Sequence, residues 1–191
     1  MDPIQQFKAW YSQEEERTQV RIPAACCFST LGTDGYPDAR FLALKEILDG
    51  EFIITGPMGG RKGQEVAAHP KAALTFWWTT TERQVRVQGD VERVSNALAD
   101  RYFEGRNSAA QVVSHTFDQG EPIAALSDLE AQFEAAMLTE DAMASNRPAT
   151  WGGWRIKPIR IEFLAFKANR LHERQLFSRV EDSWTSVYLQ P

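Results

Sequence analysis

Two adjacent cations, Arg61 and Lys62, precede a short predicted helix, and a glycine flanks them on each side. A helix N-terminus already carries positive partial charge and unpaired N–H groups, so cations there are unfavourable unless an anion lies among them. A bound phosphate would supply that anion. The alternative is a solvated basic turn, and these residues alone leave both interpretations open.

Two further cations, Arg40 and Lys45, lie in a predicted strand that is otherwise apolar. A charged side chain in such a strand is costly unless it is paired, exposed or bound to a ligand. Their separation of five residues places them on opposite faces of the strand, so they would serve two different anions. The alternative is that both are strand-end charges without a binding role.

A hydroxyl and a guanidinium lie four residues apart at Tyr102 and Arg106, near the end of a predicted helix. At this spacing both groups can reach one point beside the helix, which suits a phosphate or a carboxylate. The alternative is a tyrosine ring that packs on an arginine stem.

Arg170, His172 and Arg174 alternate with Leu171 and Glu173. On a strand this alternation places the first three side chains on one face. Two permanent cations beside an imidazole disfavour its protonation unless an anionic or π-rich group lies over them. The pattern therefore favours a ligand-binding face over a solvated edge.

Several other functions have no support in the sequence. It contains no metal-ligand cluster, nucleophile elbow, Walker loop or dinucleotide fingerprint. The net charge of -5 argues against nucleic-acid binding, which needs a basic surface. No apolar run is long enough to cross a membrane, and the N-terminus lacks the features of a signal peptide. With Cys26 and Cys27 expected to be buried thiols in a reducing compartment, we expect a cytoplasmic protein.

The elements that must position these residues follow from apolar periodicity and turn signals. A chain of 191 residues can bury about 70% of its unfolded surface, and without linker or repeat it is expected to form one domain, 1–191. A cap at Ser95 and a capping box of Ser127 with Glu130 mark two helix starts. The predicted helices are 2–17, 63–69, 95–103 and 127–138, and the predicted strands are 24–31, 38–45, 51–55, 72–78, 83–94, 154–166, 171–180 and 183–189. Many antiparallel strands with few helices indicate a mainly β fold, a Greek-key or related barrel with peripheral helices.

Taken in order, these segments resemble the pyridoxamine 5'-phosphate oxidase family over nearly the whole chain. The collinear motifs that carry the resemblance are Asp2-Pro3 with Phe7 and Trp10, Ala39-Arg40 with Leu44-Lys45, Arg61-Lys62-Gly63, Glu82-Arg83-Gln84-Val85, Tyr102-Phe103 with Arg106, Trp151-Gly152-Gly153, Arg160-Ile161-Glu162-Phe163, Arg170-Leu171-His172-Glu173-Arg174 and Leu189-Gln190-Pro191. The resemblance implies an FMN-binding split β-barrel of the Greek-key type. It also implies a homodimer that binds two FMN molecules in clefts between its subunits.

The resemblance assigns roles to individual residues, and it implies no metal. Lys45, Tyr102 and Arg106, with Ala110 beside them, would bind the substrate phosphate, while Arg170 and His172 would be catalytic and lie over the substrate ring. The residues implied to contact FMN are Arg40, Phe41, Leu42, Ala43, Leu44, Lys45, Ile54, Thr55, Arg61, Lys62, Gln84, Gln119, Gly120, Leu164 and Arg174.

The implied reaction converts pyridoxamine 5'-phosphate or pyridoxine 5'-phosphate to pyridoxal 5'-phosphate. A hydride equivalent passes from the C4' carbon to flavin N5, and O₂ then reoxidises the flavin and forms hydrogen peroxide. The expected partners are a phosphorylated B6 vitamer, O₂ and a second subunit, with no nucleic acid or membrane. Two alternatives stay open: an FMN-dependent oxidase of another reduced aromatic ring, of the phenazine-biosynthesis type, and a non-catalytic flavin- or pyridoxal-phosphate-binding protein.

The chain departs from the family pattern at a few positions near the implied ligands. Ala110 replaces the usual phosphate-binding serine, and loss of one neutral hydrogen bond costs on the order of 1 kcal/mol. Leu164 replaces a tryptophan, Ile54 a tyrosine and Gly120 a frequent serine, and segment 57–60 is one residue longer than usual. These changes predict a slightly atypical pocket, and Ala110 points toward the alternative substrate.

Overall fold

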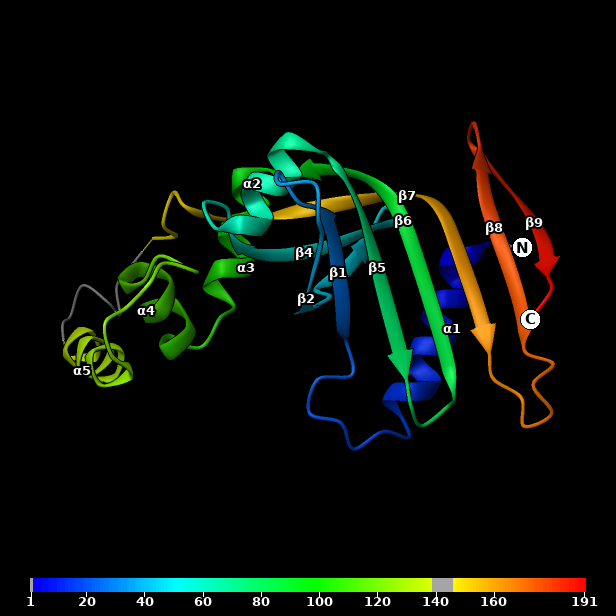
Figure 1. Cartoon of the computed structure of the whole chain (residues 1–191), viewed down its shortest axis with the longest axis horizontal. Helices are drawn as coiled ribbons and strands as arrows, with labels where there is room; N and C mark the ends of the chain where they lie inside the picture. The colour runs from blue at the N-terminus through cyan, green and yellow to red at the C-terminus, as the bar shows by residue number, and fades with distance from the viewer. Residues whose placement is uncertain (1, 139–145) are drawn as a thin grey trace.

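The computed structural model describes residues 2–138 and 146–191, and within these ranges nine strands form one antiparallel sheet that curls into a half-barrel (Figure 1). The strands are β1 (Ala25–Leu31), β2 (Pro37–Ala43), β3 (Glu46–Leu48), β4 (Glu51–Pro57), β5 (Lys71–Trp78), β6 (Arg83–Arg93), β7 (Trp151–Ala165), β8 (Glu173–Val180) and β9 (Ser183–Leu189). The helices are α1 (Pro3–Glu15), α2 (Arg61–Ala68), α3 (Asn96–Glu104), α4 (Ser108–Thr116) and α5 (Leu126–Met137). None of these helices is long and apolar enough to span a membrane.

Strand β7 organises the sheet, whose order is β2-β1-β5-β6-β7-β4-β3 with β8 and β9 added beside β7. Its first half pairs with β4 and its second half with β8, while β6 pairs with it from Trp154 to Ala165. The register between β6 and β7 shifts at Gly89, where a Cβ atom would lie only 2.2 Å from the carbonyl oxygen of Lys157. A glycine is required there because the two backbones approach so closely.

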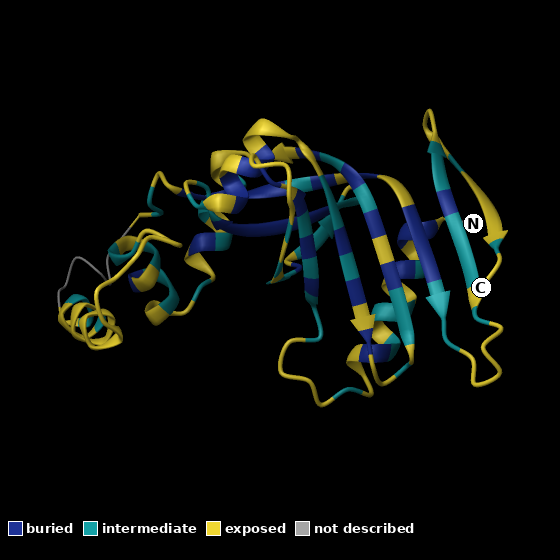
Figure 2. Cartoon of the chain, in the orientation of Figure 1, coloured by how far each residue is buried: buried dark blue, intermediate teal, exposed yellow. Residues whose placement is uncertain are grey.

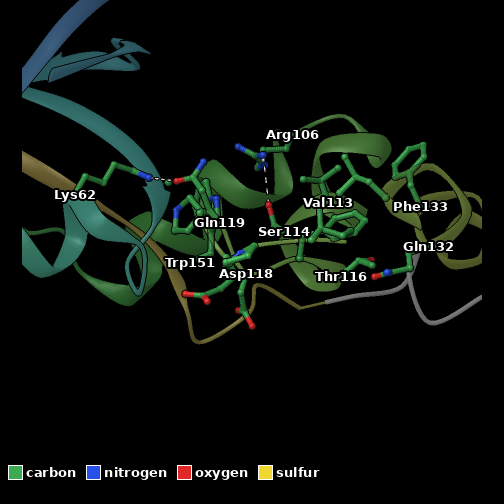
Figure 3. A pocket seen from close by; sticks show the side chains of 18 of the residues that line it. Lys62, Arg106, Val113, Ser114, Thr116, Asp118, Gln119, Gln132, Phe133 and Trp151 are labelled. Carbon is green, nitrogen blue, oxygen red and sulfur yellow. Dashed lines mark hydrogen bonds between the residues drawn. The ribbon is translucent and has the colours of Figure 1, made fainter. Parts of the chain in front are cut away.

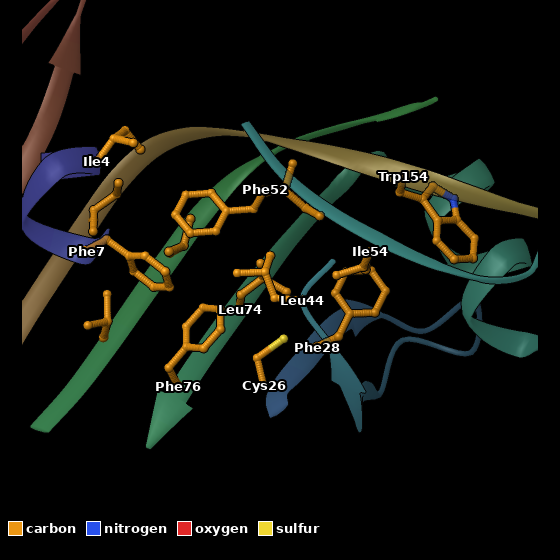
Figure 4. Close-up of a cluster of buried hydrophobic side chains, with 14 of the residues drawn as sticks. Ile4, Phe7, Cys26, Phe28, Leu44, Phe52, Ile54, Leu74, Phe76 and Trp154 are labelled. Atoms are coloured by element: carbon orange, nitrogen blue, oxygen red, sulfur yellow. The ribbon is translucent and has the colours of Figure 1, made fainter. Parts of the chain in front are cut away.

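The hydrophobic core lies inside the curl of the sheet, and α1 packs against it (Figure 4). Asp2 caps this helix by accepting a hydrogen bond from the backbone N–H of Ile4 at 2.9 Å. Phe7 then meets Phe76 and Phe52 edge to face, with ring centroids 4.9 and 5.0 Å apart. Such aromatic pairs add about 0.5–1.5 kcal/mol each to the burial of their area. The periodicity of the N-terminal segment therefore predicted both the helix and its buried face.

Most predicted elements are present with small differences in their bounds, but the predicted strand 38–45 is interrupted. Strand β2 ends at Ala43, after which the Leu44 N–H donates to the Ala24 carbonyl and the Lys45 N–H donates to the Ile53 carbonyl. Between Leu44 and Lys45 the hydrogen-bonding partner of the chain thus changes from the β1 side to β4, and β3 begins at the next residue. Sequence periodicity could not detect this change of partner because both neighbouring strands are apolar.

The helical region differs from the prediction in two respects. Helix α4 was not predicted, because only Val112 is buried in it and no apolar stripe marks it. Helix α5 begins at Leu126, after Ala125, which gives no side-chain cap. Ser127 therefore lies inside the first turn, and the capping box with Glu130 does not form. In Figure 2, α5 is exposed along most of its length, at the end of the molecule away from β8 and β9.

The two cysteines differ in their surroundings. Cys26 is fully buried, whereas Cys27 is only partly buried, so the expectation of two buried thiols is correct for Cys26 alone. Burial raises the pKa of the Cys26 thiol to about 12, and this keeps it protonated at neutral pH.

Candidate functional site

A cavity of about 880 Å³ lies where the end of β4, the start of α2 and the α4–α5 segment meet (Figure 3). One part of its wall is polar and includes Lys62, Arg106 and Gln119. The other part is apolar and includes Val113, Ile123, Leu129 and Phe133 from the helical segment. A concave site with a few converging polar groups and an apolar wall is typical of a small-molecule site.

Lys62 is a buried cation on this polar wall. Helix α2 begins at Arg61, so Lys62 lies in the first turn, where its side chain is only 6% exposed. Its ammonium donates to the side-chain oxygen of Gln119, and no carboxylate pairs with it in the described part of the chain. Burial and the nearby Arg40 lower the pKa of Lys62 to about 8. A buried ammonium with only a neutral partner favours the arrival of an anion.

Arg61, in contrast, is neutralised by the protein itself. Its guanidinium lies 3.0 Å from Asp34, 3.0 Å from Asp38 and 2.9 Å from Glu65, which is one turn further along α2. The two adjacent cations therefore have different environments. The sequence argument for a bound anion applies to Lys62, while carboxylates already compensate the charge of Arg61.

Glu65 is a residue of this region that the sequence analysis missed. It is buried at 1% exposure and accepts from the Thr30 hydroxyl at 2.6 Å, the Arg40 guanidinium at 2.9 Å and Arg61 Nε at 2.9 Å. Burial opposes ionisation of Glu65, but these hydrogen bonds outweigh it and lower the pKa to about 2. The spacing of Arg61 and Glu65 at i and i+4 was the signal that could have revealed this contact.

Arg106 and Tyr102 have separate partners rather than a common one. Helix α3 ends at Glu104, so Arg106 lies beyond the helix, where its guanidinium stacks 5.1 Å from the centre of the Trp151 ring. The Tyr102 hydroxyl donates to Glu46, and burial followed by this bond raises the pKa of Tyr102 to about 12. The two groups therefore share no protein partner, and the helical spacing between them does not continue to Arg106, so their action on one ligand stays a prediction.

Lys45 lies close enough to Arg106 for their charges to interact. The pKa of Lys45 is lowered by partial desolvation of its ammonium and by Arg106. Burial also lowers the pKa of Arg106. Neither cation forms an ion pair with a described carboxylate, and Arg106 lines the cavity.

Other residues implied to contact FMN are distributed between the cavity and the core. Leu42 and Thr55 line the cavity, whereas Leu44 and Ile54 belong to the hydrophobic core and offer only their backbone to a ligand. Phe41 is 75% exposed on β2, which also contains Ala43 and Arg40. Gly120 also lines the cavity, and its φ of 96° is one that a serine would adopt only with strain.

A second set of predicted residues lies on strands β6, β7 and β8. Gln84 is opposite Leu164, and Leu164 is opposite Arg174, so the three form one row across the sheet. Arg174 is held by Glu162, with nitrogen to oxygen distances of 2.7 and 2.9 Å.

Arg170 and His172 lie before strand β8 begins, so they are not on the same strand as Arg174. Strand β8 begins only at Glu173, and Arg170 has a positive φ of 66° in the preceding turn. The expected common strand face is therefore wrong for these two residues. His172 accepts a hydrogen bond from the Lys167 N–H at 3.1 Å, and its ring lies 4.9 Å from that of Phe166.

Many of the predicted site residues thus fall into two groups. We call the predicted residues Thr55, Lys62, Arg106 and Gln119, together with Trp151, which was not predicted, the cavity group. We call Gln84, Leu164, Arg170, His172 and Arg174 the strand-end group. In Figure 1 the cavity group lies near α2, α4 and the end of β4, whereas the strand-end group lies at the opposite end of the sheet, where β8 begins.

The cavity group contains polar atoms without a partner. Thr55 Oγ1, Arg106 Nε and Trp151 Nε1 are buried, form no hydrogen bond with any described residue, and belong to residues that line the cavity. Each such atom costs about 1–3 kcal/mol when left unsatisfied. A ligand that carries hydrogen-bonding oxygens would satisfy them. The described residues contain no cluster of His, Cys, Asp or Glu suited to a metal ion.

Comparison with known proteins bears on both groups. A family model described as Pyridoxamine 5'-phosphate oxidase matches residues 12–140, and one described as Pyridoxine 5'-phosphate oxidase C-terminal dimerisation region matches residues 151–191. The pyridoxine/pyridoxamine 5'-phosphate oxidase of Thermosynechococcus vestitus is 41% identical over 190 residues, covering 100% of this chain and 89% of that protein. The protein of the same name from Myxococcus xanthus is 37% identical, covering 100% and 92%.

Solved structures show the same fold. PhzG from Burkholderia lata, in complex with tetrahydrophenazine-1-carboxylic acid, matches with a TM-score of 0.92 and 26% identity, covering 100% of this chain and 93% of that one. A pyridoxamine 5'-phosphate oxidase-related, FMN-binding protein from Nostoc punctiforme matches with a TM-score of 0.82 and 16% identity, covering 100% and 98%. The predicted fold, a mainly β split barrel with peripheral helices, is confirmed.

Proposed function

Because the chain belongs to the pyridoxamine 5'-phosphate oxidase family, we propose that it oxidises pyridoxamine 5'-phosphate or pyridoxine 5'-phosphate to pyridoxal 5'-phosphate. FMN is the cofactor, O₂ is the electron acceptor and hydrogen peroxide is the second product. The observation that carries this proposal is the cavity, in which Lys62 and Arg106 are cations without a described carboxylate partner and three buried polar atoms lack hydrogen bonds. An anionic, oxygen-rich ligand resolves both features.

The residues present fit FMN. Lys62 supplies uncompensated positive charge for its phosphate, with the carboxylate-paired Arg40 and Arg61 near it, while Thr55 and Gln119 supply neutral polar groups. When bound, FMN accepts the hydride equivalent from the substrate C4' carbon and passes its electrons to O₂. Glu65 holds the Arg40 and Arg61 guanidinium groups in place before any ligand arrives, which lowers the ordering cost of binding.

The substrate phosphate is assigned to Lys45, Tyr102 and Arg106. Arg106 is fixed by the Trp151 ring and by a hydrogen bond of 3.1 Å to the Ala110 carbonyl oxygen. Arg170 and His172 orient the substrate ring so that the C4' carbon faces the flavin. Fixing a substrate at both its phosphate and its ring supplies the near-attack geometry on which this reaction depends.

A homodimer explains why the site residues form two separate groups in one chain. The dimerisation region matched at residues 151–191 contains β7, β8 and β9, and so most of the strand-end group. We propose that the strand-end group of one subunit lies against the cavity group of the other. A two-fold symmetric dimer then forms two equivalent sites.

The test is an anaerobic half-reaction. The protein is loaded with FMN, oxygen is removed, pyridoxine 5'-phosphate is added, and bleaching of the flavin absorbance is followed. We expect bleaching, recovery of the absorbance on admission of air, and formation of pyridoxal 5'-phosphate. Bound FMN that is not bleached by either phosphorylated vitamer contradicts the proposed substrate.

A second candidate is oxidation of another reduced aromatic ring. It is favoured by the similarity to PhzG and by Ala110, which carries no hydroxyl where the family usually has one. The same half-reaction distinguishes it, because a reduced phenazine precursor would then bleach the flavin while pyridoxine 5'-phosphate would not. Absence of bleaching with either class of ring would instead favour a non-catalytic binding protein.

A further inference from the structure

One hydroxyl in the cavity wall has no role in the function proposed above. Ser114 lies on α4 and lines the cavity beside Arg106 (Figure 3). Its Oγ donates to the Ala110 carbonyl oxygen at 2.8 Å and accepts from Arg106 Nη2 at 3.4 Å. The same Nη2 also donates to the Ala110 carbonyl oxygen at 3.1 Å. Hydroxyl, guanidinium and carbonyl therefore form a small closed network at the cavity surface.

A serine in a helix often donates a hydrogen bond to the carbonyl oxygen one turn earlier, and this common local contact is enough to explain the bond from Ser114 to Ala110. It does not explain the contact with Arg106. This guanidinium forms no ion pair with any residue in ranges 2–138 and 146–191, and its Nε is buried without a partner. A ligand in the cavity would thus meet a cation and a hydroxyl side by side.

Ser114 also provides a side-chain hydroxyl next to Arg106 on this face of α4. Ala110 lies one turn before it on the same face and has no polar side-chain atom. A hydroxyl has one rotatable proton and two lone pairs. Ser114 can therefore turn its proton from the Ala110 carbonyl to a ligand oxygen, while Arg106 keeps its own hydrogen bond to that carbonyl.

We infer that Ser114 is a substrate-binding residue that donates to the phosphate held by Arg106 and thereby selects phosphorylated over unphosphorylated substrates. This inference rests on the proposed function, because it assigns the substrate phosphate to Arg106. The network of Ser114, Arg106 and the Ala110 carbonyl places the hydroxyl one helical turn after the position that the family pattern would use.

The test compares Ser114→Ala with Ser108→Ala, an exposed serine at the start of the same helix. We expect Ser114→Ala to raise KM for pyridoxine 5'-phosphate by about tenfold or more, as expected for one hydrogen bond to a charged group, with little change in kcat. Ser108→Ala and Ser114→Thr, which keeps the hydroxyl, should leave KM near the wild-type value. An unchanged KM in Ser114→Ala, or a Ser114→Thr variant as weak as Ser114→Ala, overturns the inference.

Two further measurements separate this role from a structural one. The effect of Ser114→Ala should persist in an Arg106→Ala background, because a hydroxyl that donates directly to the phosphate acts without the guanidinium, whereas a serine that only positions Arg106 would have no further effect there. Ser114→Ala should leave the KM for unphosphorylated pyridoxine unchanged, and an equal rise for both substrates contradicts the inference.

Equilibrium binding of inorganic phosphate is measured in parallel, because it tests the role of Ser114 independently of the proposed oxidase activity. If the wild-type protein does not oxidise pyridoxine 5'-phosphate, but Ser114→Ala still weakens phosphate binding and Ser108→Ala does not, the oxidase proposal fails while the role of Ser114 as an anion-binding residue stands. Equal phosphate binding by all three proteins overturns the role of Ser114.

Discussion

Lys62 illustrates how a single buried cation can link ligand affinity to pH. Its pKa is lowered to about 8, so it is charged at neutral pH and loses its proton as the pH rises through 8. A phosphate monoester has a second pKa of about 6, so it is mostly doubly ionised at pH 7 and above. Lys62 is thus a cavity residue that titrates between pH 7 and 9.

We predict that the affinity for FMN falls as the pH rises from 7 to 9.5, because the neutral amine no longer attracts the phosphate. Lys62→Met should weaken FMN binding at pH 7 by about tenfold or more and should remove this pH dependence. Titration of FMN fluorescence at a series of pH values measures both effects. A wild-type affinity that stays constant over this range would contradict the assignment.

Glu65 makes the stability of the fold depend on pH in the acidic range. Its carboxyl has a pKa of about 2 in the folded protein, below the ordinary value of 4.5, so the ionised form stabilises the fold above pH 4.5. This contribution is lost progressively as the pH falls from 4.5 toward 2. Stability should therefore decline over that acidic interval as Thr30, Arg40 and Arg61 lose their charged acceptor.

Removing the Glu65 charge should reproduce this loss at neutral pH. We predict that Glu65→Gln lowers the free energy of unfolding by about 3 kcal/mol at pH 7, since it leaves Arg40 without its buried partner. The difference from wild type should shrink at pH 3. Urea unfolding at both pH values measures it, with the exposed Glu92→Gln as control. A loss equal at both pH values would assign the effect to packing instead of charge.

At the scale of elements, the turn between β4 and α2 decides where Lys62 points. Gly63 lies in the first turn of α2, and a Cβ atom there would lie 1.9 Å from the carbonyl oxygen of Met58. The helix can approach this turn only because the side chain is absent. A methyl group must push α2 and its lysine away from the cavity.

Gly63→Ala should therefore reduce both stability and FMN affinity. We expect the free energy of unfolding to fall by about 2 kcal/mol or more, as for overpacked sites. The matched control is Gly59→Ala in the same turn, where an added Cβ meets nothing within 4 Å. Thermal unfolding without FMN, followed by FMN titration, separates the two effects. If both alanine variants behave alike, the close approach of α2 is not what positions Lys62.

At the scale of the whole molecule, the separation of the two groups of site residues supports the proposed arrangement of the dimer. We propose that the chain folds as one unit, because β7 from the C-terminal part lies between β6 and β4 from the N-terminal part. The cavity group and the strand-end group are then fixed relative to each other within a chain. In the proposed dimer, a second chain brings its strand-end group to the cavity.

This arrangement predicts complementation between two inactive variants. Homodimers of Arg106→Ala and of Arg170→Ala should each lose most activity toward pyridoxine 5'-phosphate. A heterodimer carrying one variant in each subunit has one site with both substitutions and one with neither, so about half of the wild-type activity should return. Two affinity tags allow the heterodimer to be purified. A heterodimer as inactive as its parents would place both groups in a site formed by one chain.

The sequence by itself determined the features that depend on neighbouring residues. The alternation of Val85 and Val87 with polar residues indicated a half-buried strand, and β6 buries both valines. Ser95 predicted a helix start, and its hydroxyl accepts from the Leu98 N–H. Side-chain alternation and capping act within a few residues, so they can be detected without knowledge of the fold. The collinear motifs likewise identified the family, because their order along the chain is itself sequence information.

Only the tertiary structure decided which charges are compensated. Arg61 meets Asp34 from 27 residues earlier, whereas Lys62 meets the neutral Gln119 from 57 residues later. The difference between a neutralised arginine and an uncompensated lysine depends on which distant segments the barrel brings together. Electrostatic energy depends on distance and burial in space, so two adjacent cations that look equivalent in the sequence have opposite roles in the folded protein.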